Sequence, residues 1–415
     1  MTPSGTTLAM AQRYARPDWV RRLNAMAGAT GSAVHFVPID AGALVDSARE
    51  TTGIAEFDDL GDGDWEGRLR AVIASINASD LTVVGRLMTR EELLRCLRTR
   101  LFLGAERRRN PAVADERIVA PIVVTGPARS GTTILFELLA LDTGMRSPIA
   151  TDVMHPALPD SIDPATRRAM TESEQELWAD VQPEFAAIHE LRADLPVECI
   201  TITAPSFAGS HWSMVLDDPG AWMPEPAADF AFHKAVLQSV QHGKPQKQWL
   251  LKTPAYIFML DDLLNAYPDA SVVFSHRDTA KTMPSTVSTT TMVRWLRSDN
   301  LDVPALAELV DLIFTAGLNT VAERHLAGTL PDATGHVRFM DLMADAVAAI
   351  APAYNAIGRD FSDSHRAAIV KYLADKPRGK HGRHDYTAEE WGFDVQALRK
   401  GAATYLSTFD IVSES

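Results

Sequence analysis

A glycine-bearing turn between two apolar segments is the most distinctive chemical feature of this sequence of 415 residues. The turn reads Thr125-Gly126-Pro127-Ala128-Arg129-Ser130-Gly131-Thr132-Thr133. A β-branched run precedes it, and apolar residues at helical spacing follow it, which predicts a strand–loop–helix unit. In such a turn, backbone N–H groups and the positive end of the helix dipole point at a bound anion. The segment therefore predicts a phosphate-binding loop.

The composition of this loop sets it apart from the loops of most nucleoside triphosphatases. Gly126 and Gly131 have the spacing of the Walker A pattern, but Thr132 stands where that pattern has a lysine. Arg129 is the one cation inside the loop. A triphosphate site with Mg²⁺ normally relies on the missing lysine, whereas a phosphosulfate carries less charge and needs no metal. The loop thus argues against an ATPase or kinase.

Two further cations follow predicted strands. Lys252 ends the segment Gln248-Trp249-Leu250-Leu251-Lys252-Thr253-Pro254, and Arg277 follows the apolar run 271–275 in Ser275-His276-Arg277-Asp278. Ser285 lies about two helical turns beyond Arg277. Because open parallel sheets bind ligands at the carboxyl ends of their strands, we expect Lys252 and Arg277 to border one site.

Together these motifs resemble the sulfotransferases that use 3′-phosphoadenosine 5′-phosphosulfate (PAPS), in particular the bacterial branch with an extended helical N-terminal region. The resemblance covers nearly the whole chain and rests on the early helices, GPARSGTT, ADLPVEC, WLLKTP, YPDA, the HRD…PS segment and a C-terminal tail with His and Tyr. It implies that PAPS is the co-substrate and that no metal is needed.

The resemblance also assigns the groups that hold the nucleotide. It implies that the 5′-phosphosulfate is held by five loop residues, which are Arg129, Ser130, Gly131, Thr132 and Thr133. It implies that Arg277 and Ser285 hold the 3′-phosphate, which distinguishes PAPS from ATP. A C-terminal loop closes over the nucleotide in relatives, and the candidates here are Arg378, Gly379 and Lys380.

The implied reaction transfers a sulfuryl group to a hydroxyl of a small hydrophobic acceptor and releases adenosine 3′,5′-bisphosphate (PAP). Lys252 matches the lysine of the family's K-[ST]-P motif and would stabilise the charge that develops on the leaving phosphate. Relatives often carry Trp-Glu after the phosphate-loop helix, where this chain has Thr151-Asp152. Asp152 is therefore the first candidate for the general base, with His155 and His189 as alternatives.

The alternation of strands and helices predicts an α/β fold with a P-loop-type parallel sheet flanked by helices. We expect residues 1–117 to form a helical extension packed on the core, and residues 118–415 to form the α/β domain with a helical insert at about 156–248. Within the extension, Thr89 followed by Glu92 predicts a capping box that starts a helix.

Composition limits the partners. Lys and Arg number 40 against 54 Asp and Glu, and the net charge of −14 argues against nucleic acid. Two cysteines are too few for a disulfide scaffold, which predicts a reduced, cytoplasmic protein. We identify no signal peptide and no apolar run of bilayer length, so no integral membrane segment is expected. A homo-oligomer is possible.

Two other functions compete with sulfuryl transfer. A P-loop small-molecule kinase would need a carboxylate for Mg²⁺, and Asp278 could supply it. A non-catalytic nucleotide-binding protein would explain the departures at Thr151-Asp152 and at Tyr256, where many relatives have His. Aromatic and apolar residues of the insert favour a hydrophobic acceptor; they are Trp178, Phe185, Phe207, Trp212, Trp222 and Met223.

Overall fold

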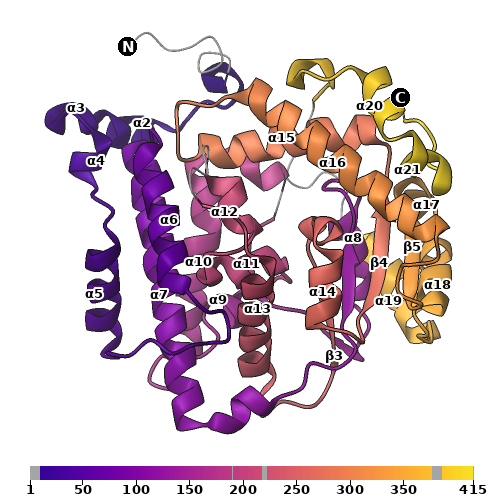
Figure 1. Ribbon diagram of the computed structural model, residues 1–415, viewed down its shortest axis with the longest axis horizontal. Coiled ribbons are helices and arrows are strands. Elements are labelled where there is room, and N and C mark those ends of the chain that lie inside the picture. The colour runs from indigo at the N-terminus through magenta and orange to yellow at the C-terminus, as the bar shows by residue number, and fades with distance from the viewer. Residues whose placement is uncertain (1–9, 189, 217–221, 376–385, 415) are drawn as a thin grey trace. The chain divides into compact units, whose positions relative to one another are not determined.

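A five-stranded parallel sheet is the framework that positions the predicted phosphate loop, as the computed structural model shows (Figure 1). Its order is β2-β3-β1-β4-β5, with β1 at the centre. The strands are β1 (Ile122–Thr125), β2 (Met145–Arg146), β3 (Gln248–Lys252), β4 (Ser271–His276) and β5 (Thr334–Arg338). The three strands predicted from sequence are the three central ones, and the predicted α/β fold class is confirmed.

The structure describes residues 10–188, 190–216, 222–375 and 386–414. The chain divides into two compact units, each assembled from separate segments. The helical unit comprises 1–117, 149–245 and 290–302, and the sheet unit comprises 118–148, 246–289 and 303–415. The expected division at residue 117 stays a prediction.

The sheet forms where it does because β1 is apolar on both faces. All four of its residues are buried, which suits a central parallel strand covered on both sides. Ile122 and Val124 pack with Leu250, Val273 and Val337 of the neighbouring strands in one hydrophobic cluster. The same cluster contains apolar residues of α8 (Thr132–Leu139), α17 (Phe339–Ala344), α18 (Ala346–Ala356) and α19 (Asp363–Asp375).

The remaining helices of the sheet unit connect the strands and end the chain. They are η4 (Pro254–Phe258), α14 (Leu260–Ala266), α16 (Val303–Leu326), η5 (Glu389–Trp391), α20 (Val395–Gly401) and α21 (Ala403–Thr408). Helix α15 (Thr279–Trp295) begins in the sheet unit, and its last residues belong to the helical unit.

Helix α16 qualifies as a membrane-spanning candidate by length and composition alone, among the helices of the described residues. It has 24 residues and a mean hydropathy of 1.4 over its most apolar window, of which 39% is buried. No uninterrupted apolar run marks this helix in the sequence, because Glu308 and Asp311 divide it. A core helix of a soluble protein meets the same criteria, so the finding is weak support for a spanning segment.

The helical unit is organised around α7 (Val83–Arg109), which packs against α5 (Ala41–Thr52). Its other helices are α2 (Asp18–Ala25), α3 (Ala27–Thr30), α4 (Ala33–Phe36), α6 (Trp65–Ala78), η1 (Pro111–Asp115), α9 (Ala150–Met154), α10 (Pro164–Val181), η2 (Pro183–Ala187), α11 (Cys199–Thr203), η3 (Ala204–Ser206), α12 (Ser210–Val215) and α13 (Pro226–Gln241).

The predicted start of α7 at Thr89 is wrong. The helix begins six residues earlier, where the Thr82 side chain accepts a hydrogen bond from the Gly85 backbone N–H. Thr89 lies inside the helix, and its hydroxyl donates to the Gly85 carbonyl at 2.8 Å. A threonine–glutamate pair at capping-box spacing therefore does not mark a helix start when another threonine caps the same helix about two turns earlier.

Candidate active site

The predicted phosphate loop lies between β1 and α8, and its backbone requires glycine at two points. Gly126 has φ of 142°, and a Cβ there would lie 2.3 Å from the Ser275 carbonyl oxygen. Gly131, at the N-cap of α8, has φ of 87°, and a Cβ would lie 2.6 Å from the Phe339 ring. These positions tolerate no side chain, because the loop folds tightly against the end of β4 and the Phe339 side chain.

Ser130 is the loop residue whose side chain is most clearly available to a ligand. The residue is fully buried, and its carbonyl oxygen accepts a hydrogen bond from Ser275 Oγ at 2.6 Å. Its own hydroxyl has no hydrogen-bond partner within the described part of the chain. A buried hydroxyl without a partner is costly, so a phosphate oxygen placed in the loop would satisfy it.

Lys252 brings a positive charge to the first turn of α8. It ends β3, pairs in register with Val124 of β1, and is 1% exposed. Its ammonium donates a hydrogen bond to the Thr133 hydroxyl, with a distance of 3.1 Å between Nζ and Oγ1. The structure therefore brings Lys252 together with the phosphate loop, and Thr133 joins the two.

Arg277 follows β4, on the other side of β1 from Lys252. Its Nη1 donates to the carbonyl oxygen of Arg129 at 3.0 Å, and its guanidinium lies 3.9 Å from the centre of the Phe339 ring. Nε and Nη2 donate to the two carboxylate oxygens of Glu414, both at 2.8 Å. This bidentate pair shows that the guanidinium is oriented to bind a planar or tetrahedral anion.

A buried aromatic network supports Arg277 from behind. Tyr405 of α21 lies 3.4 Å from the Arg277 backbone nitrogen, and its hydroxyl lies 3.2 Å from His276 Nδ1. The other ring nitrogen of His276 lies 2.9 Å from His336 Nδ1. Burial, followed by the neighbouring imidazoles, lowers the pKa of His276, and burial lowers the pKa of His336 to about 4, so both rings are neutral at physiological pH. The network positions the strand end without adding charge.

Ser285 belongs to a row of buried hydroxyls on α15. Thr279, Thr282 and Ser285 are fully buried and three residues apart, which places them along one side of the helix. Their side-chain oxygens have no hydrogen-bond partner among the described residues. The row begins two residues after Arg277, so donors for a second anion follow the guanidinium directly.

Asp278, the carboxylate required by a kinase, is already engaged. Arg399 donates to it through Nε and Nη2, the shortest contact being 2.6 Å, and the backbone N–H of Glu414 donates at 2.8 Å. Burial acts to raise the pKa of Asp278, but these hydrogen bonds prevail and hold it below its ordinary value. The carboxylate fastens the C-terminal segment.

The predicted general-base residues lie in the helical unit. Asp152, on α9, is partly exposed and forms an ion pair with Lys244 at 3.4 Å. His155 is buried, with its Nε2 3.2 Å from Glu174 Oε2. His189 and the predicted closing-loop residues Arg378, Gly379 and Lys380 lie outside the described residues. No group of three His, Cys, Asp or Glu side chains in the described ranges is arranged to hold a metal ion.

Comparison with known proteins decides the family. A sequence model of the sulfotransferase family matches residues 121–363, which is more than half of the chain and includes the loop, Lys252 and Arg277. The chain belongs to the sulfotransferase family. This sulfotransferase is thus an enzyme by family, and the kinase interpretation is set aside.

Mycobacterial sulfotransferases are among its relatives. The Mycobacterium bovis protein named omega-hydroxy-beta-dihydromenaquinone-9 sulfotransferase Stf3 is 23% identical over 290 residues, which are 66% of this chain and 72% of that protein. The crystal structure of sulfotransferase STF9 from Mycobacterium avium has a TM-score of 0.77 and 25% identity, covering 90% of this chain and 98% of that one. The recognised bacterial branch is therefore confirmed.

A second solved structure supports the fold. Sulfotransferase STF1 from Mycobacterium tuberculosis H37Rv has a TM-score of 0.72 and 23% identity, and covers 88% of this chain and 99% of that chain. Both matches extend well beyond residues 121–363, so the helical segments outside the matched family region are shared with solved sulfotransferases.

Proposed function

We propose that this sulfotransferase moves the sulfuryl group of PAPS to a hydroxyl of a small hydrophobic acceptor and releases PAP. The observation that carries the proposal is the edge of the sheet where the phosphate loop, buried Lys252 and Arg277 follow three adjacent parallel strands. Carboxyl ends of parallel strands are the usual ligand sites of open α/β sheets. Family membership supports the choice of PAPS as donor.

The donors at this edge fit the two phosphate-bearing ends of PAPS. The loop, with the hydroxyl of Ser130 and the ammonium of Lys252, suits the 5′-phosphosulfate. Arg277 and the hydroxyl of Ser285, which has no partner among the residues described, suit the 3′-phosphate. In this assignment the 3′-phosphate replaces the Glu414 carboxylate on Arg277, one anion taking the place of another.

Sulfuryl transfer forms a bond between the acceptor oxygen and sulfur and breaks the bond between sulfur and the bridging phosphate oxygen. The electron pair of the broken bond stays on PAP, where the developing charge needs a cation. Lys252 meets that need because its ammonium is buried next to the loop. The acceptor proton passes to a general base, for which Asp152, His155 and His189 remain our candidates.

A hydrophobic acceptor has support from one relative. The Mycobacterium bovis relative is named for a hydroxylated menaquinone, which is an apolar molecule with a hydroxyl. The aromatic residues of the insert give less support than expected, since Phe207, Trp212 and Trp222 belong to the hydrophobic core of the helical unit. Met223 is 69% exposed.

Calorimetric titration with PAP and with ADP, without Mg²⁺, tests the donor assignment. We expect PAP to bind at least tenfold more tightly than ADP, because only PAP has a phosphate for Arg277. Arg277→Ala should remove this preference. The matched control is Arg324→Ala, which removes an arginine of α16 paired with Asp261 and should leave PAP binding unchanged.

Two results would contradict the proposal. Equal affinity for ADP and PAP in the wild type would show that no site recognises the 3′-phosphate. A requirement for Mg²⁺ would point to phosphoryl chemistry instead. If Arg277→Ala still prefers PAP over ADP, the assignment of PAPS as donor stands, but Arg277 is not the residue that recognises its 3′-phosphate.

A further inference from the structure

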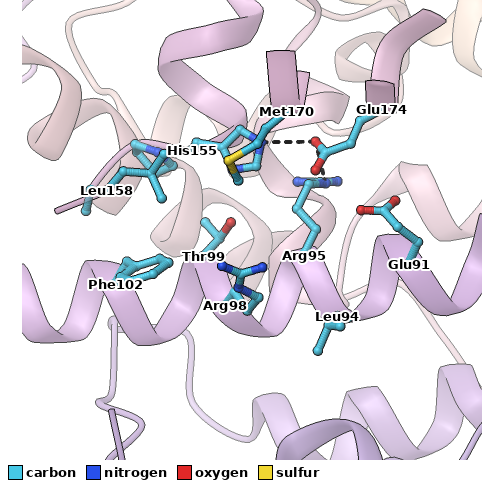
Figure 2. Close-up of a pocket in the computed structure, with 12 residues that line it drawn as sticks. Glu91, Leu94, Arg95, Arg98, Thr99, Phe102, His155, Leu158, Met170 and Glu174 are labelled. Carbon is cyan, nitrogen blue, oxygen red and sulfur yellow. Dashed lines mark ion pairs between the residues drawn. The ribbon is translucent and has the colours of Figure 1, made fainter. Parts of the chain in front are cut away.

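A pocket of about 180 Å³ lies inside the helical unit, between α7, α10 and the segment after α9. Phe102 and Leu158 lie on one side of it, and Arg95 and Glu174 lie on the other (Figure 2). All of its lining residues belong to this one unit. The pocket therefore has an apolar end and a charged end.

The charged side chains at one end of the pocket are buried, and the contacts between them are long. Arg95 Nε lies 3.4 Å from Glu174 Oε2, and His155 Nε2 lies 3.2 Å from the same oxygen (Figure 2). The side chains of Arg95 and His155 are each 6% exposed and that of Glu174 is 10% exposed. Neither contact has the geometry of a hydrogen bond to Oε2. Charges this deep are normally hydrogen-bonded, because their burial is otherwise costly.

Four lining atoms are buried without a hydrogen-bond partner among the residues that the structure describes. Two are guanidinium donors, Arg95 Nη1 and Arg98 Nε. The others are Glu174 Oε2, which only accepts, and His155 Nε2, whose role depends on the tautomer. Buried polar atoms in folded proteins are usually hydrogen-bonded, and a molecule bound in the pocket would satisfy these four.

The mixture of donors and acceptors identifies the kind of group that fits. A hydroxyl donates one hydrogen bond and accepts others, so it can satisfy Glu174 and a guanidinium at once. A carboxylate or sulfate would meet the negative charge of Glu174, and an ammonium would meet Arg95 and Arg98. Phe102, Leu158 and Met170 make the remaining wall apolar, so a ligand that fills the pocket needs an apolar part as well.

The volume limits the size of the apolar part. A cavity of about 150 Å³ with apolar walls holds one benzene molecule. A pocket of about 180 Å³ therefore accepts one ring or a short alkyl chain beside the hydroxyl. Larger molecules would have to extend out of it.

We propose that this pocket binds a phenol or alcohol with an apolar body about the size of one ring. Arg95 and Arg98 donate hydrogen bonds to the hydroxyl oxygen of the ligand, and that hydroxyl donates a hydrogen bond to Glu174.

Methyl NMR of the full chain labelled with ¹³C at the methionine methyl groups tests the proposal. Met170 lines the pocket, and the Met170→Leu variant identifies its signal among those of the 14 methionines. We expect phenol to shift the Met170 signal and to bind at least tenfold more tightly than benzene, because a site built for a hydroxyl rejects an analogue without one. Benzoate should bind more weakly than phenol.

Variants of lining residues test whether phenol binds in this pocket and not elsewhere on the protein. Glu174→Gln should weaken phenol binding about tenfold, while Glu176→Gln, on the exposed side of α10, should not change it. If Glu174→Gln does not fold, Leu158→Trp provides the test, since it fills the pocket from the segment after α9. It should abolish the phenol-induced shift without changing the affinity for PAP.

The outcomes distinguish this inference from the proposed function. If PAP binds but phenol leaves the Met170 signal unmoved, the pocket assignment is wrong and the donor assignment stands. Equal binding of benzene and phenol, or tighter binding of benzoate, would also overturn it. If phenol shifts the signal but PAP does not bind, the proposal that PAPS is the donor fails while the hydroxyl site stands.

Discussion

The edge of the sheet and the pocket of the helical unit both concentrate buried charge, but they satisfy it differently. Arg277 has a bidentate carboxylate and a carbonyl within 3.0 Å, and Lys252 has the Thr133 hydroxyl. At the pocket, Arg95 and His155 reach Glu174 only at 3.4 and 3.2 Å. The sheet edge thus has oriented cations, and we propose that an anionic ligand takes the place of Glu414 there. The pocket has mixed donors and acceptors, which suit a neutral hydroxyl.

Among variants of these two regions, Lys252→Met should lower enzyme turnover the most. It removes the cation that we assign to the bridging oxygen while keeping the size of the side chain, and we expect turnover to fall by a factor of about 100 or more. The measurement is PAP formation from PAPS with the acceptor that the wild type uses best. Lys247→Met, an exposed residue before β3, is the control. Unchanged turnover in Lys252→Met would remove this lysine from the reaction.

Glu414→Gln tests the other cation of the sheet edge, Arg277, through the affinity for PAP. The Glu414 carboxylate occupies both donors of Arg277 that a 3′-phosphate would use, so its neutralisation should raise PAP affinity about tenfold. Calorimetry with PAP measures this, and Glu389→Gln, an exposed residue of η5, is the control. A loss of affinity would mean that Glu414 orients Arg277 for the ligand and does not compete with it.

Asp229 is a buried carboxyl of α13 in the helical unit. Burial raises its pKa to about 7, against the lowering effect of hydrogen bonds from Ser206 and Thr203. Because the folded state holds the proton more tightly than the unfolded state, stability falls as pH rises towards 7. The contribution lost between pH 6 and 8 is about 1 kcal/mol.

Asp229→Asn, which has no proton to lose, should therefore gain stability relative to the wild type by about this amount over the same range. Thermal unfolding at pH 6 and pH 8 measures the difference. Asp180→Asn, at an exposed position of α10, should leave the pH dependence unchanged. A parallel pH dependence in the wild type and Asp229→Asn would show that Asp229 is ionised throughout.

The central part of the fold was predictable because its signals are local. Buried β-branched runs marked β1 and β4, and the apolar segment before Lys252 marked β3. Strand β5, Thr334–Arg338, was not predicted because polar residues alternate with Gly335 and Val337, which leaves no apolar run. Strand β2 has only two residues, Met145–Arg146, which is too short for any periodicity.

The site residues at the strand ends were predictable from the sequence, but the residues that contact and orient them were not. Arg277 and Lys252 follow recognisable strands, but Tyr405 and Glu414 come from the last helix and the segment after it, more than 120 residues away in sequence. Arg95 and Glu174 were missed for a different reason. Charged residues on helices are usually solvent-exposed, so only the packing of α7 against its neighbours reveals that these two are buried.

The strand order also determines how long β1 remains without its partner strands while the chain is synthesised. Strand β1 ends at Thr125, but its partners β3 and β4 end only at Lys252 and His276. At about 5–20 residues per second, the ribosome needs on the order of 10 s to deliver the first partner. During that interval the Ile122-Val123-Val124 run has no strand to pair with, and exposed apolar segments and unpaired strand edges favour aggregation. Conditions that slow translation between β1 and β3 should therefore lower the soluble yield of this enzyme more than slowing after β4.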